Sequence, residues 1–368
     1  MNFAFNEDQD ELRATARAFL ADHSGSAQVR AAMESELGHD PQVWKQIAME
    51  LGWAAVAIPE AYGGLGLGAV EVTALVEVMG ESLLCVPFFS SVCLGASALV
   101  VAGTEEQKQE HLPRIAEGEC IATLAHAGPS EAIAVRFRPE ADGASLSGAA
   151  DFVVDGCTAD LLIVAAQSEN AEDVALFVVP GDADGLARTV QPTLDQTRRL
   201  ASVRFDNVRL PASARMSGGE DSLQEILDRA RIALAAEQVG GAQRCLDLAV
   251  AYAKEREQFG RPIGSFQAIK HKCANMMIEI ESARSAAYYA ACAAAEGSDE
   301  LPIVASLAKA YCSDTYFQCA AECLQIHGGV GFTWEYDVHL YLKRARSSET
   351  LLGDPSYHRE RVAGLIGL

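Results

Sequence analysis

The chain has 368 residues, and its 51 acidic and 29 basic side chains give a formal charge of −22 at pH 7. A surface this acidic repels phosphate backbones and anionic lipid headgroups, so we expect neither nucleic-acid binding nor attachment to a membrane. Apolar residues make up 49% and charged residues 22%, which supplies a sizeable core and excludes intrinsic disorder. At about 150 residues per domain, the length predicts two or three domains.

Ten cysteines are spread from Cys85 to Cys323 without a CxxC pair, and the first residues lack the basic start and apolar stretch of a signal peptide. We therefore expect thiols in a reducing cytoplasm rather than a disulfide scaffold. Cys312, Cys319 and Cys323 recur at helical spacing, which is more typical of small core residues than of metal ligands. No metal site is predicted.

The first part of the chain, to about residue 118, is expected to be helical. Asn6 can cap a helix that runs through Phe19, and Asp40-Pro41 begins another. The glycine-rich stretch 59–68 is expected to be a turn, because no strand precedes it as a dinucleotide-binding fingerprint requires.

The stretch 82–104 carries no charge and is long enough to span a bilayer. It contains Pro87, Gly95 and Gly103, and no excess of basic residues flanks it. A buried helix–turn–helix is therefore the preferred interpretation.

Between about residues 119 and 215 the pattern changes to short β-branched runs separated by turn signals such as Asp142-Gly143 and Asp155-Gly156. This pattern predicts a small antiparallel β domain. The expected strands are Asp151–Val154, Leu161–Ala165, Val174–Val179 and Ala201–Phe205.

The helical pattern then returns in long units that glycine and proline separate, which predicts a four-helix bundle. The expected helices are Asp221–Arg256, Ser265–Glu296, Pro302–Ile326, Glu335–Leu352 and Pro355–Gly364. The predicted organisation is an N-terminal α-helical domain at 1–118, a middle β domain at 119–215 and a C-terminal helical bundle at 216–368.

Two segments carry more specific information: Arg256 to Gln267, with the sequence REQFGRPIGSFQ, and Gln325 to Phe332, with the sequence QIHGGVGF. An arginine fork at a helix end can hold a pyrophosphate through charge-assisted hydrogen bonds, and glycines let the backbone approach another group closely. The residues alone also fit a helix C-cap followed by a turn that an aromatic side chain anchors.

Together with the 59–68 turn and the order of helices, β domain and helices, the two segments resemble the acyl-CoA dehydrogenase family over essentially the whole chain. The resemblance implies that each FAD lies between two subunits, and that one of them grips the isoalloxazine ring with its β domain and C-terminal segment. It also implies which residues of this chain contact the adenine and pyrophosphate half of a neighbour's FAD: Arg256, Phe259, Ile263, Gln267, Gln325 and Gly329.

On the ring side of its own flavin, the chain departs from the family pattern. The poorly matching stretch 124–131 replaces a TEPGxGSD-like loop. Phe152–Gly156 replaces a WITNG-like element and places Val154 where family members carry a threonine hydroxyl. Valine cannot hydrogen-bond a flavin.

The family's catalytic base, a carboxylate that removes the α proton of the acyl thioester, is missing from both of its usual positions. Leu352 occupies the position in the YEGT-like segment, and Ala230, just before Arg231, occupies the alternative one. The fallback candidates are Glu349, one helical turn before Leu352, and Glu237, nearly two turns after Ala230.

These losses, beside intact adenine-side motifs, lead to the hypothesis of a non-catalytic subunit in a heteromeric acyl-CoA dehydrogenase, an α2β2 tetramer with a second acyl-CoA dehydrogenase-like subunit. The ending LLGDPS, followed by Arg359, resembles bacterial enzymes that degrade steroid side chains as CoA thioesters. The resemblance implies α,β-dehydrogenation of an acyl-CoA and an electron-transfer flavoprotein as acceptor. Two alternatives stay open: a self-sufficient homotetramer that uses Glu237 or Glu349 as its base, and a flavin-free scaffold.

Overall fold

The structure is a computed structural model that describes residues 6–126, 133–170 and 173–368. It separates into two compact units. The helical unit comprises Met1–Ala31, Ala69–Leu84 and Arg231–Leu368, and the β unit comprises Ala32–Gly68 and Cys85–Ala230. Each unit is made of separate stretches of the chain, so this division does not test the domain boundaries expected at 118 and 215, which stay a prediction.

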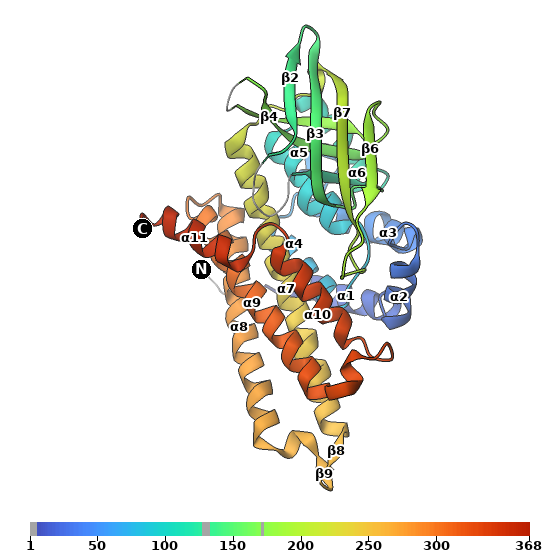
Figure 1. Ribbon diagram of the computed structural model, residues 1–368, viewed down its shortest axis with the longest axis vertical. Coiled ribbons are helices and arrows are strands. Elements are labelled where there is room, and N and C mark those ends of the chain that lie inside the picture. The colour runs from blue at the N-terminus through green and yellow to red at the C-terminus, as the bar shows by residue number, and fades with distance from the viewer. Residues whose placement is uncertain (1–5, 127–132, 171–172) are drawn as a thin grey trace. The chain divides into compact units, whose positions relative to one another are not determined.

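The β unit is built around a seven-stranded sheet (Figure 1). Its strands are β1 (Ala122–Ala125), β2 (Arg136–Glu140), β3 (Gly143–Val154), β4 (Leu161–Ser168), β5 (Val174–Pro180), β6 (Leu186–Val190) and β7 (Leu200–Pro211). They follow the order β1-β4-β2-β3-β7-β6, and β5 also pairs with β4. The core of this unit includes Phe137 and Phe177, whose ring centroids lie 5.3 Å apart.

The sheet is mixed, which corrects the expectation of a purely antiparallel domain. Strand β4 runs parallel to β1 and β2, whereas the pairs β2–β3, β3–β7, β4–β5 and β6–β7 are antiparallel. The physical reason is the β2–β3 hairpin, which separates β1 from β4 in the chain. This intervening segment lets β4 return beside β1 in the same direction, as a parallel pair requires.

Short helices complete the β unit. Asp40 caps the first of them, because its side chain accepts a hydrogen bond from the backbone N–H of Gln42. The helices are α3 (Pro41–Lys45), η1 (Gln46–Glu50), η2 (Trp53–Ala55), η3 (Glu60–Tyr62), η4 (Phe89–Ala96), α5 (Ser97–Ala102), α6 (Glu105–Ala116) and η5 (Ala212–Ala214).

Most of the uncharged stretch 82–104 lies in η4 and α5, whose side chains are largely buried. No helix in the described part of the chain has both the length and the apolar character that crossing a membrane needs.

The helical unit contains the long helices. Asn6 and Gln9 form a capping box at the start of the first one, as the sequence predicts for Asn6. The helices are α1 (Glu7–His23), α4 (Ala69–Glu81), α8 (Gln267–Glu296), α9 (Leu301–His327), η7 (Gly328–Phe332), α10 (Val338–Thr350) and α11 (Pro355–Leu365). Helix α2 (Ser26–Glu34) and helix α7 (Glu220–Glu255) each run from one unit into the other.

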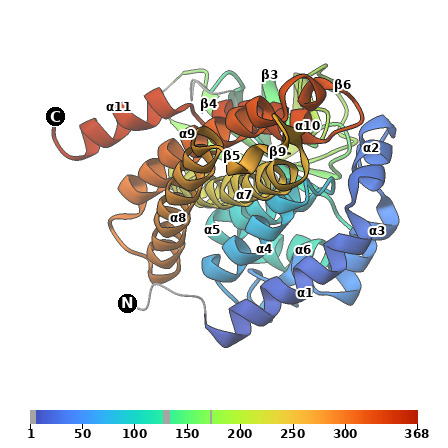
Figure 2. The same cartoon turned by 90° about the horizontal axis from the view of Figure 1, so that it is seen from below.

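Helix α9 is central to this unit, because it packs against α8, α10 and α11 (Figures 1 and 2). Helices α4 and α7 approach each other at two glycines. A Cβ atom on Gly240 would lie 1.8 Å from the carbonyl oxygen of Glu77, and one on Gly80 would lie 2.2 Å from that of Glu237. Only glycine permits this close approach.

Candidate cofactor and base sites

The first predicted cofactor segment follows the end of α7. The backbone N–H of Arg256 donates to the carbonyl of Tyr252 at 2.9 Å, and the N–H of Ile263 donates to the carbonyl of Arg256 at 2.8 Å. These bonds close a short hairpin of β8 (Glu257–Gln258) and β9 (Arg261–Pro262). Phe259 lies at its tip with 92% of its surface exposed, although a buried location would be usual for phenylalanine.

The second predicted segment is the glycine turn after α9. Gly328 has φ 63°, which glycine adopts without strain. A Cβ atom on Gly328 or Gly329 would meet no other atom within 4 Å, whereas one on Gly331 would lie 3.2 Å from the carbonyl oxygen of Leu324. The first two glycines therefore keep open space above the backbone, and the third serves packing within the chain.

The structure brings the two segments to the same end of the helical unit. The ring of Tyr252, one turn before Arg256, stacks on the ring of His327 with centroids 4.3 Å apart. His327 directly precedes the glycine turn, and Gln325 is exposed on the last turn of α9. Figure 1 shows the β8–β9 hairpin at the tip of the helices in this unit.

The exposed polar groups at this end fit a flavin pyrophosphate. In the described chain, the guanidinium of Arg256 and the side-chain amides of Gln267 and Gln325 make no ion pair or side-chain hydrogen bond. Ile263, which precedes Gln267 in the chain, is half-buried, and Gln267 is the first residue of α8. Donors without partners and an open glycine backbone are what an external phosphate requires. The assignment of these residues to a cofactor stays a prediction.

The loop that carries the expected base position is held by its backbone. Leu352 has φ 60°, a left-handed conformation that is strained for leucine. Its carbonyl oxygen accepts a hydrogen bond from Nε of Arg231 at 3.2 Å and one from Nε2 of His358 at 3.1 Å. Arg231 and His358 are almost completely buried. The backbone of this loop is therefore fixed although its side chain carries no carboxylate.

A fully buried lysine fastens the same loop from the other side. The ammonium of Lys309 donates to Oγ of Ser313 at 2.9 Å, to the carbonyl of Glu349 at 3.1 Å and to that of Gly353 at 3.0 Å. Burial, and then the charge of Arg231, lower the pKa of Lys309 to about 7. These three acceptors match the three donors of an ammonium group.

The fallback carboxylates all have structural partners. Glu237 is buried on α7, accepts from Oγ of Ser348 at 3.3 Å and lies 3.6 Å from Nε of Arg344. Glu349 pairs with Nη1 of Arg346 at 2.6 Å. Buried carboxylates are normally paired, and Glu349 is paired with an exposed arginine, so neither contact indicates a catalytic base.

Asp354, which follows the loop, is also occupied. Its side chain accepts the backbone N–H of Tyr357 at 2.8 Å and so caps α11. Because a cap is a sufficient reason for an aspartate at this position, we assign it no other role.

The β unit contains the position expected to face the flavin ring. Val154 ends β3 and is buried, and its carbonyl accepts a hydrogen bond from Oγ1 of Thr123 at 2.7 Å. The next residue, Asp155, has φ 51° and accepts from Oγ of Ser90 at 2.6 Å. Of the other expected element, 124–131, the part from residue 127 on lies outside the described residues.

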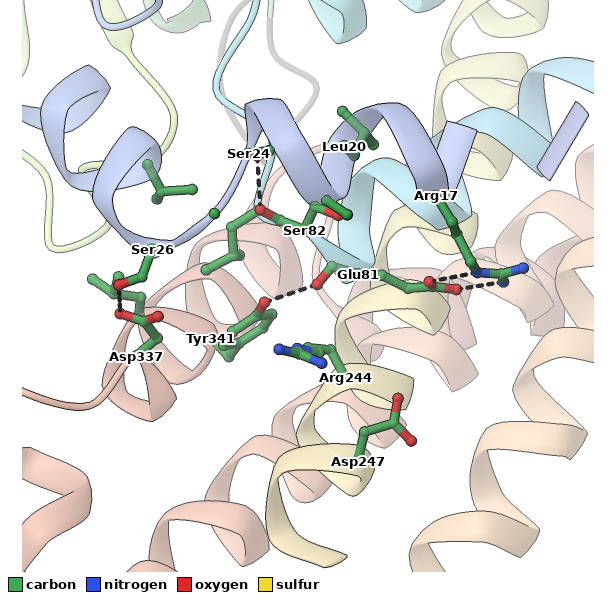
Figure 3. A pocket seen from close by; sticks show the side chains of 15 residues that line it. Arg17, Leu20, Ser24, Ser26, Glu81, Ser82, Arg244, Asp247, Asp337 and Tyr341 are labelled. Carbon is green, nitrogen blue, oxygen red and sulfur yellow. Dashed lines mark hydrogen bonds and ion pairs between the residues drawn. The ribbon is translucent and has the colours of Figure 1, made fainter. Parts of the chain in front are cut away.

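A cavity of about 390 Å³ lies in the helical unit, lined by residues of α1, α2, α4, α7 and α10 and of the turns beside them. Figure 3 shows Arg17 paired with Glu81, and Ser26 bonded to Asp337, along its wall. Because none of its lining residues belongs to the predicted cofactor or base positions, we assign the cavity no chemistry.

Sequence reasoning missed two buried groups at the base position, Lys309 and His358. A signal for the first was present, because a lysine between alanines in an apolar helix is unusual in a core. His358 gave no such signal, since it lies on a short helix with charged neighbours. All ten cysteines are thiols, and Cys312, Cys319 and Cys323 are buried in α9, as expected.

Comparison with known proteins identifies the family of the chain. Residues 6–119 match the family model of the acyl-CoA dehydrogenase N-terminal domain, and residues 217–366 match that of the C-terminal domain. The chain belongs to the acyl-CoA dehydrogenase family, whose members are FAD-dependent oxidoreductases.

The chain is 36% identical over 357 residues to acyl-CoA dehydrogenase IpdE2 of Mycolicibacterium smegmatis, which covers 97% of this chain and 98% of that protein. The ChsE4-ChsE5 complex from Mycobacterium tuberculosis has a similar fold, with a TM-score of 0.93, 28% identity and 100% of both chains covered. The Tcur3481-Tcur3483 steroid ACAD is also similar, with a TM-score of 0.90, 33% identity and 98% of each chain covered.

Proposed function

We propose that this chain is the non-catalytic subunit of a heteromeric acyl-CoA dehydrogenase and completes the FAD site of a second, catalytic subunit in an α2β2 assembly. The observation that carries the proposal is the state of the loop at Leu352. The loop is held by Arg231 and His358, yet the residue at the base position is apolar. An apolar side chain cannot take the α proton of a thioester.

The contrast between the two halves of a flavin site supports this division of roles. At the adenine and pyrophosphate end, Arg256, Gln325 and Gly329 are exposed and present donors or open backbone. On the ring side, Val154 offers no hydroxyl. A chain that keeps the first half and lacks groups of the second is suited to hold a neighbour's flavin rather than its own.

Similarity to heteromeric assemblies supports a second subunit. The chain resembles a chain of the ChsE4-ChsE5 complex and of the Tcur3481-Tcur3483 steroid ACAD, each named as a pair. We therefore place a second acyl-CoA dehydrogenase-like chain beside this one and a steroid side-chain CoA thioester in the catalytic subunit. We place the proposed assembly in a reducing cytoplasm, because all ten cysteines of this chain are thiols.

In the proposed assembly the reaction is α,β-dehydrogenation. A carboxylate of the catalytic subunit would remove the α proton of the acyl-CoA, and bound FAD would supply the hydride-accepting chemistry at the β carbon. An electron-transfer flavoprotein would be the electron acceptor. This chain contributes Arg256, Gln267, Gln325 and Gly329 across the interface, together with contacts of Phe259 and Ile263. In this proposal the chain binds and orients the cofactor.

The decisive experiment measures flavin absorbance per chain for this protein alone and after co-expression with its catalytic partner. The proposal predicts no flavin for the chain alone and about half a flavin per chain in the complex. One flavin per chain from this protein alone, with turnover, would instead support a self-sufficient homotetramer. No flavin in either preparation would support a scaffold.

A substitution then assigns the cofactor contact to this chain. Arg256→Ala should weaken FAD binding by the complex roughly ten- to hundredfold, because a charge-assisted contact is worth about 1.5–3 kcal/mol. Arg204→Ala is the matched control, since Arg204 is an exposed arginine on β7. Equal FAD affinity in the two variant complexes would contradict the assignment.

A further inference from the structure

His327 lies between the two segments that the proposed function assigns to the partner's flavin. It is the last residue of α9, it is buried, and the open turn at Gly328 and Gly329 follows it directly. Its ring stacks on Tyr252, whose carbonyl accepts the backbone N–H of Arg256. One side chain therefore contacts the supports of both flavin-binding segments.

The imidazole is fixed by a hydrogen bond as well as by stacking. Its Nδ1 donates to the carbonyl oxygen of Cys323 at 2.8 Å, one turn earlier in α9. A carbonyl oxygen can only accept, so Nδ1 carries the proton. The Sγ atom of Cys323 lies 3.8 Å from the same nitrogen. The ring is thereby held against α9 while its face is presented to α7.

A third aromatic ring closes the cluster. Tyr336, in the segment after the glycine turn, meets His327 edge-on at 5.8 Å and Tyr252 edge-on at 6.3 Å. Aromatic contacts of this kind are worth about as much as a weak hydrogen bond beyond their buried area. The cluster connects the end of α7, the end of α9 and the chain that leads to α10.

We propose that His327 is a positioning residue for the partner's flavin, because its stack on Tyr252 sets the distance between Arg256 and the Gly328–Gly329 turn. This inference rests on the proposed function. It adds that the two flavin-binding segments act as one preorganised unit, so that loss of the stack weakens cofactor binding although His327 itself touches no cofactor. The chemistry at the catalytic subunit is left unchanged.

The test is FAD titration of the complex that carries His327→Ala. We expect FAD affinity to fall about three- to tenfold, the size of one aromatic pair. His327→Phe keeps a ring for the stack and should recover most of this loss. Turnover of the His327→Ala complex at saturating FAD should equal that of the unaltered complex, so the defect appears in the FAD concentration required and not in kcat.

The chain offers a matched control for loss of a histidine stack. His23 stacks on Phe19 within α1, with centroids 4.3 Å apart and planes at 24°, nearly the geometry of Tyr252 and His327. His23→Ala should leave FAD affinity unchanged. If His327→Ala and His23→Ala bind FAD equally well, or if His327→Phe recovers nothing, the positioning role is wrong.

A double variant separates this inference from the proposed function. In the His327→Ala background, Arg256→Ala should cost less FAD affinity than it does alone, because the two residues then act as one unit. Loss of affinity for Arg256→Ala but none for His327→Ala overturns only the positioning role. No effect of Arg256→Ala in either background overturns the proposed function itself.

Discussion

Nε of Arg231, on α7, lies 3.2 Å from the carbonyl oxygen of Leu352, in the loop after α10. Because the bond is made to the backbone, it holds the loop whatever side chain stands at position 352. His358 makes a second bond to the same oxygen. The loop at which the family resemblance predicts a carboxylate is therefore held in place with leucine at that position, so an apolar residue there need not disturb the fold.

His358 makes the free energy of unfolding of the chain depend on pH. Burial, and then the charges of Lys309 and Arg231, lower the pKa of His358 from its ordinary 6.5 to about 3. The hydrogen bond that Nε2 donates to the carbonyl of Leu352 acts in the opposite direction and raises this pKa, but burial and the two neighbouring charges outweigh it. Between pH 6.5 and pH 3 the unfolded chain binds a proton that the folded chain does not, and stability falls as the pH is lowered.

The contribution of His358 to this loss is on the order of a few kcal/mol at the acid end. Urea denaturation at a series of pH values should therefore show a steeper acid limb for the unaltered chain than for His358→Gln. His23→Gln, at a half-buried position at the end of α1, should keep the steep limb. An unaltered slope in His358→Gln would show that His358 is not the titrating group.

Lys309→Met should destabilise the chain, because it leaves the carbonyls of Glu349 and Gly353 without their buried donor. Buried acceptors that lose a partner cost about 1–3 kcal/mol each, and relief of the desolvated charge offsets part of this. We expect a net loss of about 2–4 kcal/mol in the free energy of unfolding at pH 7. The control is Lys270→Met, since Lys270 is exposed on α8.

The same variant has a signature in its pH dependence. Because the pKa of Lys309 is lowered from 10.5 to about 7, the unfolded chain binds more protons between these values and stability rises with pH there. Lys309→Met should remove this rise. A variant as stable as the unaltered chain at pH 7, with the same rise, would contradict the role of the ammonium in holding the loop.

Helices and their ends were the most predictable part of the fold. The sequence predicts Asp221–Arg256 and Ser265–Glu296, and the structure has Glu220–Glu255 and Gln267–Glu296. Long periodic segments and local caps such as Asn6 carry this information within a few residues of the chain. The expected order of helices, β-sheet and helices is confirmed by the fold and by the family matches.

Strands were predicted less completely, for a physical reason. Strand β1 is completely buried and carries no alternation, whereas β2 and β6 are largely exposed and rich in polar residues. Their pairing comes from partners elsewhere in the sheet, which a single sequence does not display. The parallel pairing of β4 was missed for the same reason.

The candidate site divides in the same way. Residues in short motifs, such as Arg256 and Gly329, could be proposed from the sequence because their chemistry is local. Lys309, His358 and the stack of Tyr252 on His327 could not, since each depends on segments that are distant in the chain. Long-range contacts decide which polar side chains are buried together.

Glu237→Gln distinguishes a structural carboxylate from a relocated base. The change keeps the shape of the side chain but removes its charge beside Arg344. Loss of one member of a buried ion pair typically costs about 3–5 kcal/mol, and the remaining amide can still accept from Ser348, so about 2–4 kcal/mol is expected here. Turnover per assembled complex should be unchanged.

The two readouts of this variant decide between the interpretations. Thermal unfolding measures the loss of stability, and dehydrogenation of an acyl-CoA at saturating substrate measures turnover. Glu349→Gln is the companion variant, because Glu349 pairs only at the surface with Arg346, whose side chain is 57% exposed. Abolished turnover in either variant, with the complex still assembled, would restore that glutamate as a base.

Gly329→Val tests whether the open glycine turn serves a cofactor or only the fold. A Cβ atom at Gly329 meets nothing within 4 Å, and its φ lies outside the left-handed region, so valine should fold there with little cost. The added side chain would occupy the space where a neighbour's flavin approaches the backbone. We expect unchanged unfolding temperature and FAD affinity of the complex at least tenfold weaker, as a steric clash with the cofactor demands.

Gly331 supplies the converse variant. A Cβ atom there would lie 3.1 Å from that of His327 and 3.2 Å from the carbonyl oxygen of Leu324. Gly331→Val should therefore lower the unfolding temperature, in contrast to Gly329→Val. If both variants lost stability and bound FAD equally, the turn would be a packing element. Loss of FAD affinity in Gly329→Val, at full stability, marks the turn as a surface kept open for a cofactor.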